Sequence, residues 1–550
     1  MPFAQQYVIL TKQEHIEIKS EASYWKTQHT RAIERIAALE KKLEEAEGKI
    51  RDLKHRLYGQ KSEQGSQPRN NKQFVESASP DKKKRKRGQQ TGSKGHGKTP
   101  RPDLPVDEIE VKIPQDEACC PTCHKPFVPF PGTEDSDSIE IEVRAHIRRI
   151  HRQRYKPSCH CLHLPSIITA PAPPRLLPRN TLGISVWSDV ILDKYLYNRP
   201  TYRLLEYYKT LGLPISQGTI TDGLKRLAPM FEPLVTAMYE KQMSESLFNG
   251  DETRWRVFEV VEGKIGYRWY LWVIISASVV YYLVAPGRGA DVPMNHFSGL
   301  DSTIREVILV CDRYSAYKKL AREITIIKLA FCWSHVRRDF IDESRSYPEH
   351  KEWMFVWVVE IRQLYQINDQ RVSVWDASKS LQEQSVDFNT HHQELQNALS
   401  CMAKRRDEVL SQANLPTPQK AVLSSLKNHW EGLTLFVDHP EIPMDNNSSE
   451  RQLRQPANGR KNYYGSGSQW SAYLMAGLFT LLKTILLWKL DPRHWLTAFL
   501  TACAENGGKT PDDLTPFLPW SMSEERKQLL SQPLPPVQQI NPSIEPANTS

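Results

Sequence analysis

The sequence predicts a multidomain α/β protein with a mixed β-sheet and a long N-terminal helix. Of its 550 residues, 39% are hydrophobic and 25% charged, which is usual for soluble globular chains long enough to form several domains. Residues 247–340 pass from three consecutive strands to strands that alternate with helices, and this favours a mixed sheet. Residues 25–57 carry a heptad repeat that predicts the N-terminal helix.

The first predicted segment, 1–64, is a helix that forms a coiled coil. Its two core positions are filled by Ile36, Leu43, Ile50 and Leu57 and by Leu39, Ala46 and Leu53. Gly48 weakens the repeat. We expect a homo-oligomer through this helix, because a coiled coil needs a partner. The alternative is an amphipathic helix that folds back onto its own chain.

The next segment, 65–106, is predicted to be a disordered basic linker. Residues 82–101 hold nine Lys or Arg and no acid, so they account for the whole net charge of +9. Such a segment cannot build a core, yet its charge density suits DNA phosphates. The residues expected to contact DNA are Lys82, Lys83, Lys84, Arg85, Lys86 and Arg87. A plain solubilising linker is the alternative.

Residues 107–168 hold a cysteine cluster that predicts a zinc-ribbon-like module. The first pair has C-x-x-C spacing and the second is a tighter C-x-C: Cys120 and Cys123, then Cys159 and Cys161. Four thiolates satisfy tetrahedral Zn²⁺ and leave no open position, so the zinc would be structural. Other possible ligands are Cys119, His124, His160 and His163. Reduced thiols without metal are the alternative.

A helical region is expected over 169–240, after a Pro-rich hinge. Gly212 breaks a first helix and Ser216 can cap a second, which is predicted to run from Gln217 to Leu227. A pair of helices of this kind can place a recognition helix in a major groove. The spacing fits a structural helical hairpin equally well.

Two apolar runs raise the question of a membrane. Residues 269–285 are shorter than a membrane helix needs and centre on Ser-Ala-Ser, so two buried strands joined by a turn are predicted. Residues 471–490 contain Lys483 and Lys489 and are predicted to be a packed helix. With no secretory signal and no disulfide-like cysteine spacing, we expect a cytoplasmic, nucleoid-associated protein without a membrane partner.

Two aspartates occupy positions that packing explains poorly. Asp312 directly follows the apolar run "VILVC", and Asp251 lies in the first strand of the predicted sheet. Functional crevices lie at strand ends in open α/β sheets, and a charge at a core edge is costly unless it is paired. The alternatives are a helix N-cap for Asp312 and a turn residue for Asp251, with Glu252 as the competing acid.

A third acid, Glu450, begins an arginine-rich helix. Its spacing from Asn447 fits a capping box, but with Asp251 and Asp312 it would form an acidic triad. Oxygen-only ligands select Mg²⁺ or Mn²⁺, and a pair of such ions supports phosphoryl transfer. The basic residues that would then lie near substrate phosphates are Arg451, Arg454, Arg460 and Lys461, and those that could stack on bases are Tyr463, Tyr464 and Trp470.

Four motifs together resemble the transposases of the insertion sequence 66 family. They are "GDETRW" at Asp251, "VCDRYSAY" at Asp312, "CWSHVRRDF" at 332–340 and "NNSSERQLR…GRKNYYGSGS" at 446–468. "LKHRLYGQKSE" at 53–63 is similar to the N-terminal region of the same family. The cysteine cluster takes the position of the family's zinc module, although the family usually has C-x-x-C where this chain has Cys159-His160-Cys161.

The resemblance implies a DDE transposase with a ribonuclease-H-like catalytic core over 241–340 and 441–506, interrupted by a helical insertion over 341–440. The Pro-rich, polar composition of the C-terminal tail, 507–550, predicts disorder. The resemblance also implies that Asp251, Asp312 and Glu450 are the catalytic acids, that Mg²⁺ serves cleavage at the element ends, and that the freed 3′ hydroxyl attacks target DNA. His335 and Arg338 would lie near the active site. Expected partners are DNA and other proteins of the same element. The alternatives are a catalytically silent DNA-binding regulator derived from a transposase and a metal-dependent nuclease without strand transfer.

Overall fold

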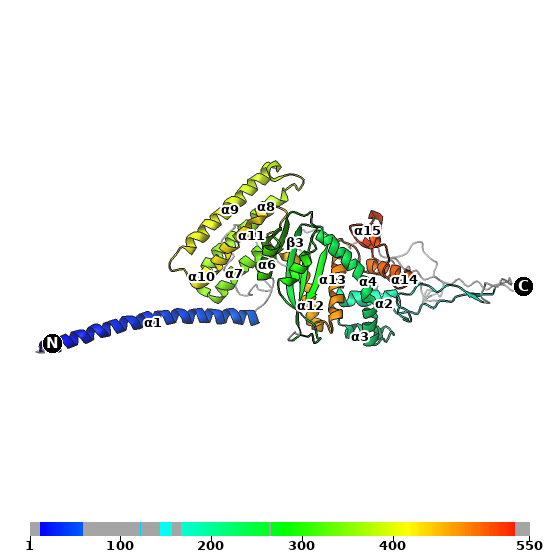
Figure 1. Ribbon diagram of the computed structural model, residues 1–550, viewed down its shortest axis with the longest axis horizontal. Helices are drawn as coiled ribbons and strands as arrows, with labels where there is room; N and C mark the ends of the chain where they lie inside the picture. Colours follow the sequence, from blue (N-terminus) through cyan, green and yellow to red (C-terminus); the bar gives the residue numbers. More distant parts are fainter. Residues whose placement is uncertain (1–10, 59–121, 123–142, 157–166, 263–265, 534–550) are drawn as a thin grey trace. The chain divides into compact units, whose positions relative to one another are not determined.

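The computed structural model describes residues 11–58, 122, 143–156, 167–262 and 266–533 (Figure 1). Its first element is one long helix, α1 (Lys12–Tyr58), as the heptads predict. The apolar heptad side chains Ile36, Leu39, Leu43, Ile50 and Leu53 are between 50% and 61% exposed. The predicted coiled coil would cover them. The predicted basic linker over 65–106, the four predicted zinc ligands Cys120, Cys123, Cys159 and Cys161, and residues 534–550 lie outside the described residues.

The main sheet has five strands in the order β5-β4-β3-β6-β7. The strands are β3 (Leu247–Arg256), β4 (Arg268–Ile275), β5 (Val280–Ala285), β6 (Val307–Cys311) and β7 (Ile327–Phe331). The first three run antiparallel, while β3, β6 and β7 run parallel to one another. The predicted mixed α/β architecture is therefore confirmed, including the turn at Ser276 between two buried strands. A separate two-stranded ribbon pairs β1 (Arg154–Tyr155) with β2 (Ile168–Thr169).

Successive side chains along each strand point alternately to the two faces of the sheet, and both faces are covered by helices. Phe248, Trp272 and Leu309 point to the face covered by α5 (Asp291–Phe297) and α6 (Ser315–Glu323). The opposite face is shared by two groups of helices. Strands β4 and β5 pack there against one group, whereas Ile308 and Val310 of β6 pack against the other. The boundary between the two groups of helices therefore crosses this face near β3 and β6, and we call this boundary the seam.

The first group begins with α2 (Ile184–Tyr195), α3 (Thr201–Thr210) and α4 (Gln217–Met243). Gly212 has a φ of +74° in the turn before α4, and the Ser216 hydroxyl accepts a hydrogen bond from Thr219 N at 3.1 Å, as a helix cap does. The predicted end of this helix at Leu227 is wrong, because α4 continues to Met243 through Pro229 and Pro233. Buried apolar residues such as Phe231 and Leu234 offset the two missing N–H donors, so α4 is a core helix along most of its length.

The second group consists of α7 (Trp333–Ser346), α8 (Lys351–Ser373), α9 (Val386–Leu410), α10 (Thr417–Asn428) and α11 (Trp430–Thr434). These helices gather beside the β6–β7 side of the sheet (Figure 1). The buried Arg371 of α8 ties them together by donating to the carbonyl oxygens of Val437 and Phe436 at 2.8 and 2.7 Å. Burial lowers the pKa of its guanidinium to about 10.

The chain then returns to the sheet through α12 (Asn447–Tyr463) and α13 (Gln469–Leu487), followed by α14 (Pro492–Glu505) and α15 (Glu524–Ser531). The expectation of disorder is therefore wrong for the first part of the tail, because Phe517, Met522 and Leu530 are buried in the core. Helix α13 is long and apolar enough to cross a membrane, but most of it is buried against β5 and α4. Thr480 and Thr484 hydrogen-bond to the backbone N–H groups of Tyr282 and Val280 at 2.9 and 3.1 Å. These contacts belong to a core helix, as the sequence predicts.

Candidate active site

Asp251 and Asp312 lie on two neighbouring strands at the seam. Strands β3 and β6 are parallel, with Asn249 opposite Val310. Continuing this register places Asp251 beside Asp312. Side chains alternate between faces, and Asn249 contacts the start of α12. Asp251, two residues further along, therefore points to the same face as Asn249.

The start of α12 is fastened to β3 directly beside Asp251. The buried Asn446 side chain donates from Nδ2 to the carbonyl oxygen of Gly250 at 2.7 Å. Its Oδ1 accepts from Asn249 Nδ2 at 3.1 Å and from Ser449 Oγ at 2.8 Å. These bonds fix the first turn of α12, which carries Glu450. Sequence reasoning missed the positioning role of Asn446, although the pair Asn446-Asn447 was visible three residues before Glu450.

Glu450 does not act as a helix cap in this structure. Helix α12 has Asn446 at its N-cap and no side-chain capping bond. Glu450 Oε1 is buried without a hydrogen-bond partner and lies 3.7 Å from His335 Nε2 on the first turn of α7. The two helix starts are adjacent because Trp333 N donates to the carbonyl oxygen of Met444 at 2.9 Å. A buried carboxylate oxygen without a partner is costly, so packing does not explain Glu450.

The three predicted acids share one electrostatic environment. Burial raises the pKa of Asp251 well above its ordinary value, and the carboxylates of Glu252, Asp312 and Glu450 raise it further. A single backbone bond, from Glu252 N to Asp251 Oδ1 at 2.8 Å, opposes this rise. Burial also lowers the pKa of His335, and Arg338 lowers it further. His335 therefore lies near the acids, as the family resemblance implies, and Arg338 lies near His335.

Glu252, the alternative to Asp251 as a site acid, already has partners within the protein. Its side chain is almost fully buried and forms an ion pair with Arg288. Arg288 Nε donates to Glu252 Oε1 at 2.7 Å and Tyr317 OH donates to Oε2 at 2.9 Å. The Arg288 guanidinium also stacks on the Tyr314 ring, 3.8 Å from its centroid. Glu252 thus supports the site from the opposite face of the sheet, while Asp251 faces the seam. No motif in the sequence pointed to Arg288.

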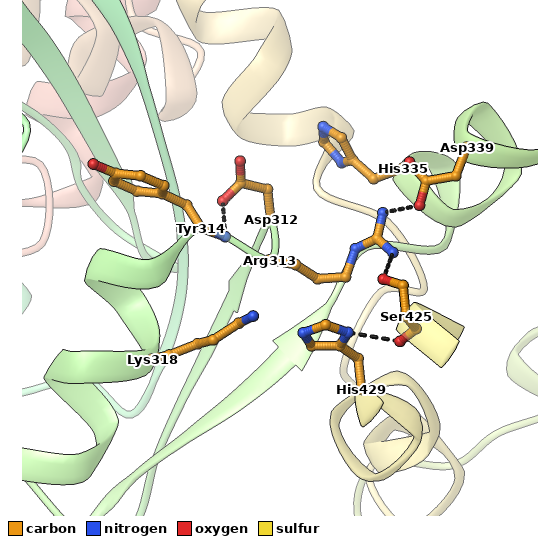
Figure 2. Close-up of a pocket in the computed structure, with 8 residues that line it drawn as sticks. All are labelled: Asp312, Arg313, Tyr314, Lys318, His335, Asp339, Ser425 and His429. Carbon is orange, nitrogen blue, oxygen red and sulfur yellow. Dashed lines mark hydrogen bonds and ion pairs between the residues drawn. The ribbon is translucent and has the colours of Figure 1, made fainter. Parts of the chain in front are cut away.

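A pocket of about 490 Å³ opens beside Asp312. Figure 2 shows the side chains around it, which come from the loop after β6, from α6 and α7, and from the C-terminal end of α10. Arg313 links these walls, since it donates to Asp339 of α7 at 2.5 Å and to Ser425 of α10 at 3.0 Å. The helical insertion predicted over 341–440 therefore contributes a wall directly beside an acid of the candidate site.

The acids fit a divalent cation by chemistry, although their side chains do not form a complete metal site. In the described ranges, no group of three His, Cys, Asp or Glu side chains is arranged to hold a metal ion. The raised pKa of Asp251 and the unpartnered oxygen of Glu450 both indicate negative charge that lacks compensation. A hard cation bound by carboxylate oxygens would supply that compensation.

Basic residues extend from the acids along β3 and α12. Arg460 donates to the carbonyl oxygen of Arg254 and to Thr253 Oγ1. Burial lowers the pKa of Arg460, and the nearby charges of Arg254 and Arg256 lower it further. Within the described segments, none of these three arginines forms an ion pair with an acid. Sequence reasoning missed Arg254 and Arg256, although both follow Asp251 in "GDETRWR".

The other predicted DNA-contacting residues fall into two sets. Arg451, Arg454 and Lys461 are exposed on α12, while Lys82, Lys83, Lys84, Arg85, Lys86 and Arg87 lie outside the described residues. Among the aromatic residues, Tyr464 is 67% exposed. Tyr463 instead packs against the core near Trp255 and Lys194, so the expectation that it stacks on bases is not supported.

Comparisons with known proteins agree with the resemblance. The sequence model of a family described as "Transposase IS66 family" matches residues 179–473. Among curated proteins, the chain is similar to "Uncharacterized protein y4jD" of Sinorhizobium fredii (strain NBRC 101917 / NGR234), with 25% identity covering 80% of this chain and 84% of that one. It is also similar to "Uncharacterized protein y4hP" of the same organism, with 23% identity covering 76% and 75%. No solved structure matches. Because the family match spans more than half of the chain and includes all three acids, this protein belongs to the Transposase IS66 family.

Proposed function

We propose that this protein is a DNA transposase that cuts the ends of a bacterial insertion sequence and joins them to target DNA. The observation that carries the proposal is the convergence of Asp251, Asp312 and Glu450 from β3, the end of β6 and α12 on one electrostatic site. The three acids lie far apart in sequence, and packing explains neither Asp251 nor Glu450. Asp312 also has a structural role, because its Oδ1 accepts a hydrogen bond from Tyr314 N at 2.9 Å in the turn before α6. The five-stranded mixed sheet that carries two of them supports a ribonuclease-H-like core.

The reaction needs two phosphoryl transfers at one site. In the first, a water oxygen attacks the scissile phosphorus and the 3′ oxygen leaves, which yields a 3′ hydroxyl. In the second, that hydroxyl attacks a phosphodiester of target DNA, the bond from phosphorus to the 3′ oxygen of the target strand breaks, and that 3′ oxygen leaves. Asp251, Asp312 and Glu450 would hold Mg²⁺ or Mn²⁺, which activates the attacking oxygen and stabilises the leaving one.

The protein's own residues position these groups. Asn446 fixes the first turn of α12 against β3, so it sets where Glu450 stands relative to Asp251. Glu252, held by Arg288 and Tyr317, keeps the other face of β3 rigid. Preorganised carboxylates of this kind need little reorganisation when charge develops in the transition state.

Three arginines that follow Asp251 on β3 or lie beside that strand on α12 support DNA as the substrate. Arg254, Arg256 and Arg460 come close together without a compensating acid in the described ranges. Like charges held together at a surface favour binding of a polyanion, and phosphate contacts of this kind position DNA without reading its sequence. We infer that the duplex passes along β3 and α12 toward the acids.

Two further assignments belong to this proposal and concern segments outside the site. Zinc bound by Cys120, Cys123, Cys159 and Cys161 would stabilise the module before the hinge, and elemental analysis of anaerobically purified protein should find it. Protein without zinc would contradict this assignment. The exposed heptad face of α1 supports a homo-oligomer.

The test is a strand-transfer assay with Mg²⁺, a labelled duplex carrying the inverted repeat that flanks the gene, and a supercoiled plasmid. Joined product is the expected result. Hydrolysis without joining would indicate a nuclease, and binding without cleavage would indicate a silent DNA-binding regulator. Either outcome would overturn the proposal.

A further inference from the structure

Among the described residues that line the pocket beside Asp312, one cation has no partner. Arg313 is not that cation, because its guanidinium is shared between Asp339 Oδ2 and Ser425 Oγ. Lys318, half-buried on α6, lines the same pocket. Within the described residues its ammonium forms no hydrogen bond or ion pair. Figure 2 shows its Nζ directed into the space between the loop after β6 and His429.

The surroundings of Lys318 favour an anionic ligand. Burial lowers its pKa and the Arg313 charge lowers it further, while Asp312 has the opposite effect. An ammonium that is partly desolvated and repelled by a guanidinium gains by acquiring an anion. Asp339, the other carboxylate of the pocket, is already neutralised by Arg313. The carboxylate of Asp312 would be shared with the cation of the proposed reaction.

The far wall of the pocket belongs to the helical insertion. His429 ends α10 and its Nδ1 donates to the carbonyl oxygen of Ser425 at 2.7 Å. Its ring also packs edge-on against Phe331 at 5.1 Å, so its position is fixed from two sides. A carbonyl oxygen can only accept, so Nδ1 carries the proton and Nε2 of the neutral ring is an acceptor. The wall is therefore rigid and polar.

We propose that this pocket binds a backbone phosphate of the DNA strand held at Asp312, with the Lys318 ammonium as its main ligand and α10 of the helical insertion as the enclosing wall. The proposal rests on the proposed function, because the strand must reach the acids. It assigns the insertion a part in positioning DNA. A role limited to balancing the charge of Asp312 is the competing explanation for Lys318.

The experiment measures cleavage of the labelled inverted-repeat duplex in Mg²⁺ for the wild type, Lys318→Met and Lys318→Arg. Lys319→Met is the matched control, because Lys319 is an exposed neighbour on α6 outside the pocket. Lys318→Met should raise the apparent KM for DNA about tenfold, as expected for removal of one charged interaction. Lys318→Arg should retain most of the affinity, and Lys319→Met should behave as wild type.

The same assay is then run on duplexes in which single phosphates near the cleavage site are replaced by neutral methylphosphonates. One position should weaken the wild type about tenfold and have no further effect in Lys318→Met. If every position affects both proteins equally, or if Lys318→Met matches the wild type, the pocket does not bind a backbone phosphate. Failure of the wild type itself to cut the unmodified duplex would instead count against the proposed function.

Discussion

Asp251 is held in an environment that disfavours its charged form. Burial and three neighbouring carboxylates raise its pKa well above its ordinary value. The acid therefore binds its proton more tightly in the folded than in the unfolded protein. Without metal, the free energy of unfolding should fall as pH rises from about 4, the ordinary pKa of Asp, toward the raised value.

Asp251→Asn should consequently stabilise the metal-free protein at neutral pH while abolishing catalysis. A gain in unfolding free energy is expected because the neutral amide has no charge to bury beside the three carboxylates. Thermal unfolding without added Mg²⁺ at several pH values measures it. The gain should shrink toward pH 4 and when Mg²⁺ is added to the wild type. If the wild type and Asp251→Asn melt at equal temperatures across this pH range, the folded protein does not disfavour the charged form of Asp251.

Glu450→Gln should keep DNA binding and lose cleavage. The substitution removes the charge that would bind metal but nearly preserves side-chain shape, and Asn446 still anchors α12. A loss of 100-fold or more is expected, because even the groups that support metal ligands contribute about 10–100-fold. Cleavage and gel-shift assays on the same duplex separate the two effects. Normal cleavage by this variant would leave Glu450 without a catalytic role.

At the scale of elements, the packing of α4 on α2 gives a prediction that does not involve the active site. A Cβ at Gly223 would lie 1.9 Å from the ring of the fully buried Trp187, whereas a Cβ at Gly218 of the same helix meets nothing closer than 3.8 Å. Gly223→Ala should lower the free energy of unfolding by about 1–3 kcal/mol through overpacking. Gly218→Ala should raise it by up to about 1 kcal/mol through helix propensity.

Chemical denaturation of the two alanine variants checks this pair. Opposite signs are expected, because the same substitution changes helix propensity similarly at both positions and only Gly223 faces Trp187. If both variants are stabilised, α4 does not pack on α2 in this way.

Much of the sheet was predictable from local patterns, because each signal lay within one strand. The run "VILVC" before Asp312 is β6, and the break near Glu262 separates β3 from β4. The full length of α4 was not predictable, since Pro229 and Pro233 are ordinarily signals of a helix end. Tertiary burial of Phe231 and Leu234 outweighs those signals, and burial cannot be seen from one segment.

In the candidate site, too, local patterns could be read from the sequence but contacts between distant segments could not. The three acids could be proposed from the sequence because each stands in a short motif that is unusual for packing. Their neighbours Arg288, Lys318 and Asn446 could not be proposed in this way, because only the tertiary fold brings them to the site. The role of the helical insertion as a pocket wall likewise depends on the fold, which brings α10 back to the loop after β6.

At the scale of the whole molecule, the charge is concentrated outside the described core. Deleting 82–101 removes nine cations and should flatten the dependence of DNA affinity on salt. For every phosphate that is no longer neutralised, the slope of log K against log salt becomes shallower by about 0.9. Fluorescence anisotropy between about 50 and 300 mM salt measures the slope, with a variant that carries a neutral linker of equal length as the comparison. An unchanged slope would make the segment a spacer.

The oligomer proposed for α1 is also a property of the whole molecule. Changing Leu43 and Ile50 to Lys places charges in the predicted coiled-coil core, where burial is costly. Sedimentation should then show a smaller assembly than the wild type. The control pair Glu34→Lys and Glu44→Lys introduces the same side chain outside the two core positions and should leave the assembly unchanged. Identical assemblies for all three proteins would exclude this interface.

The central claim is that Asp251, Asp312 and Glu450 bind one metal centre, and metal-directed cleavage of the polypeptide tests it most directly. Fe²⁺ added in place of Mg²⁺ with ascorbate and peroxide produces hydroxyl radicals that cut the chain beside the bound ion. The predicted result is cutting near residues 251, 312 and 450 together, suppressed by excess Mg²⁺ and absent in Asp251→Asn. Cuts confined to other segments, or at only one of the three positions, would contradict the claim.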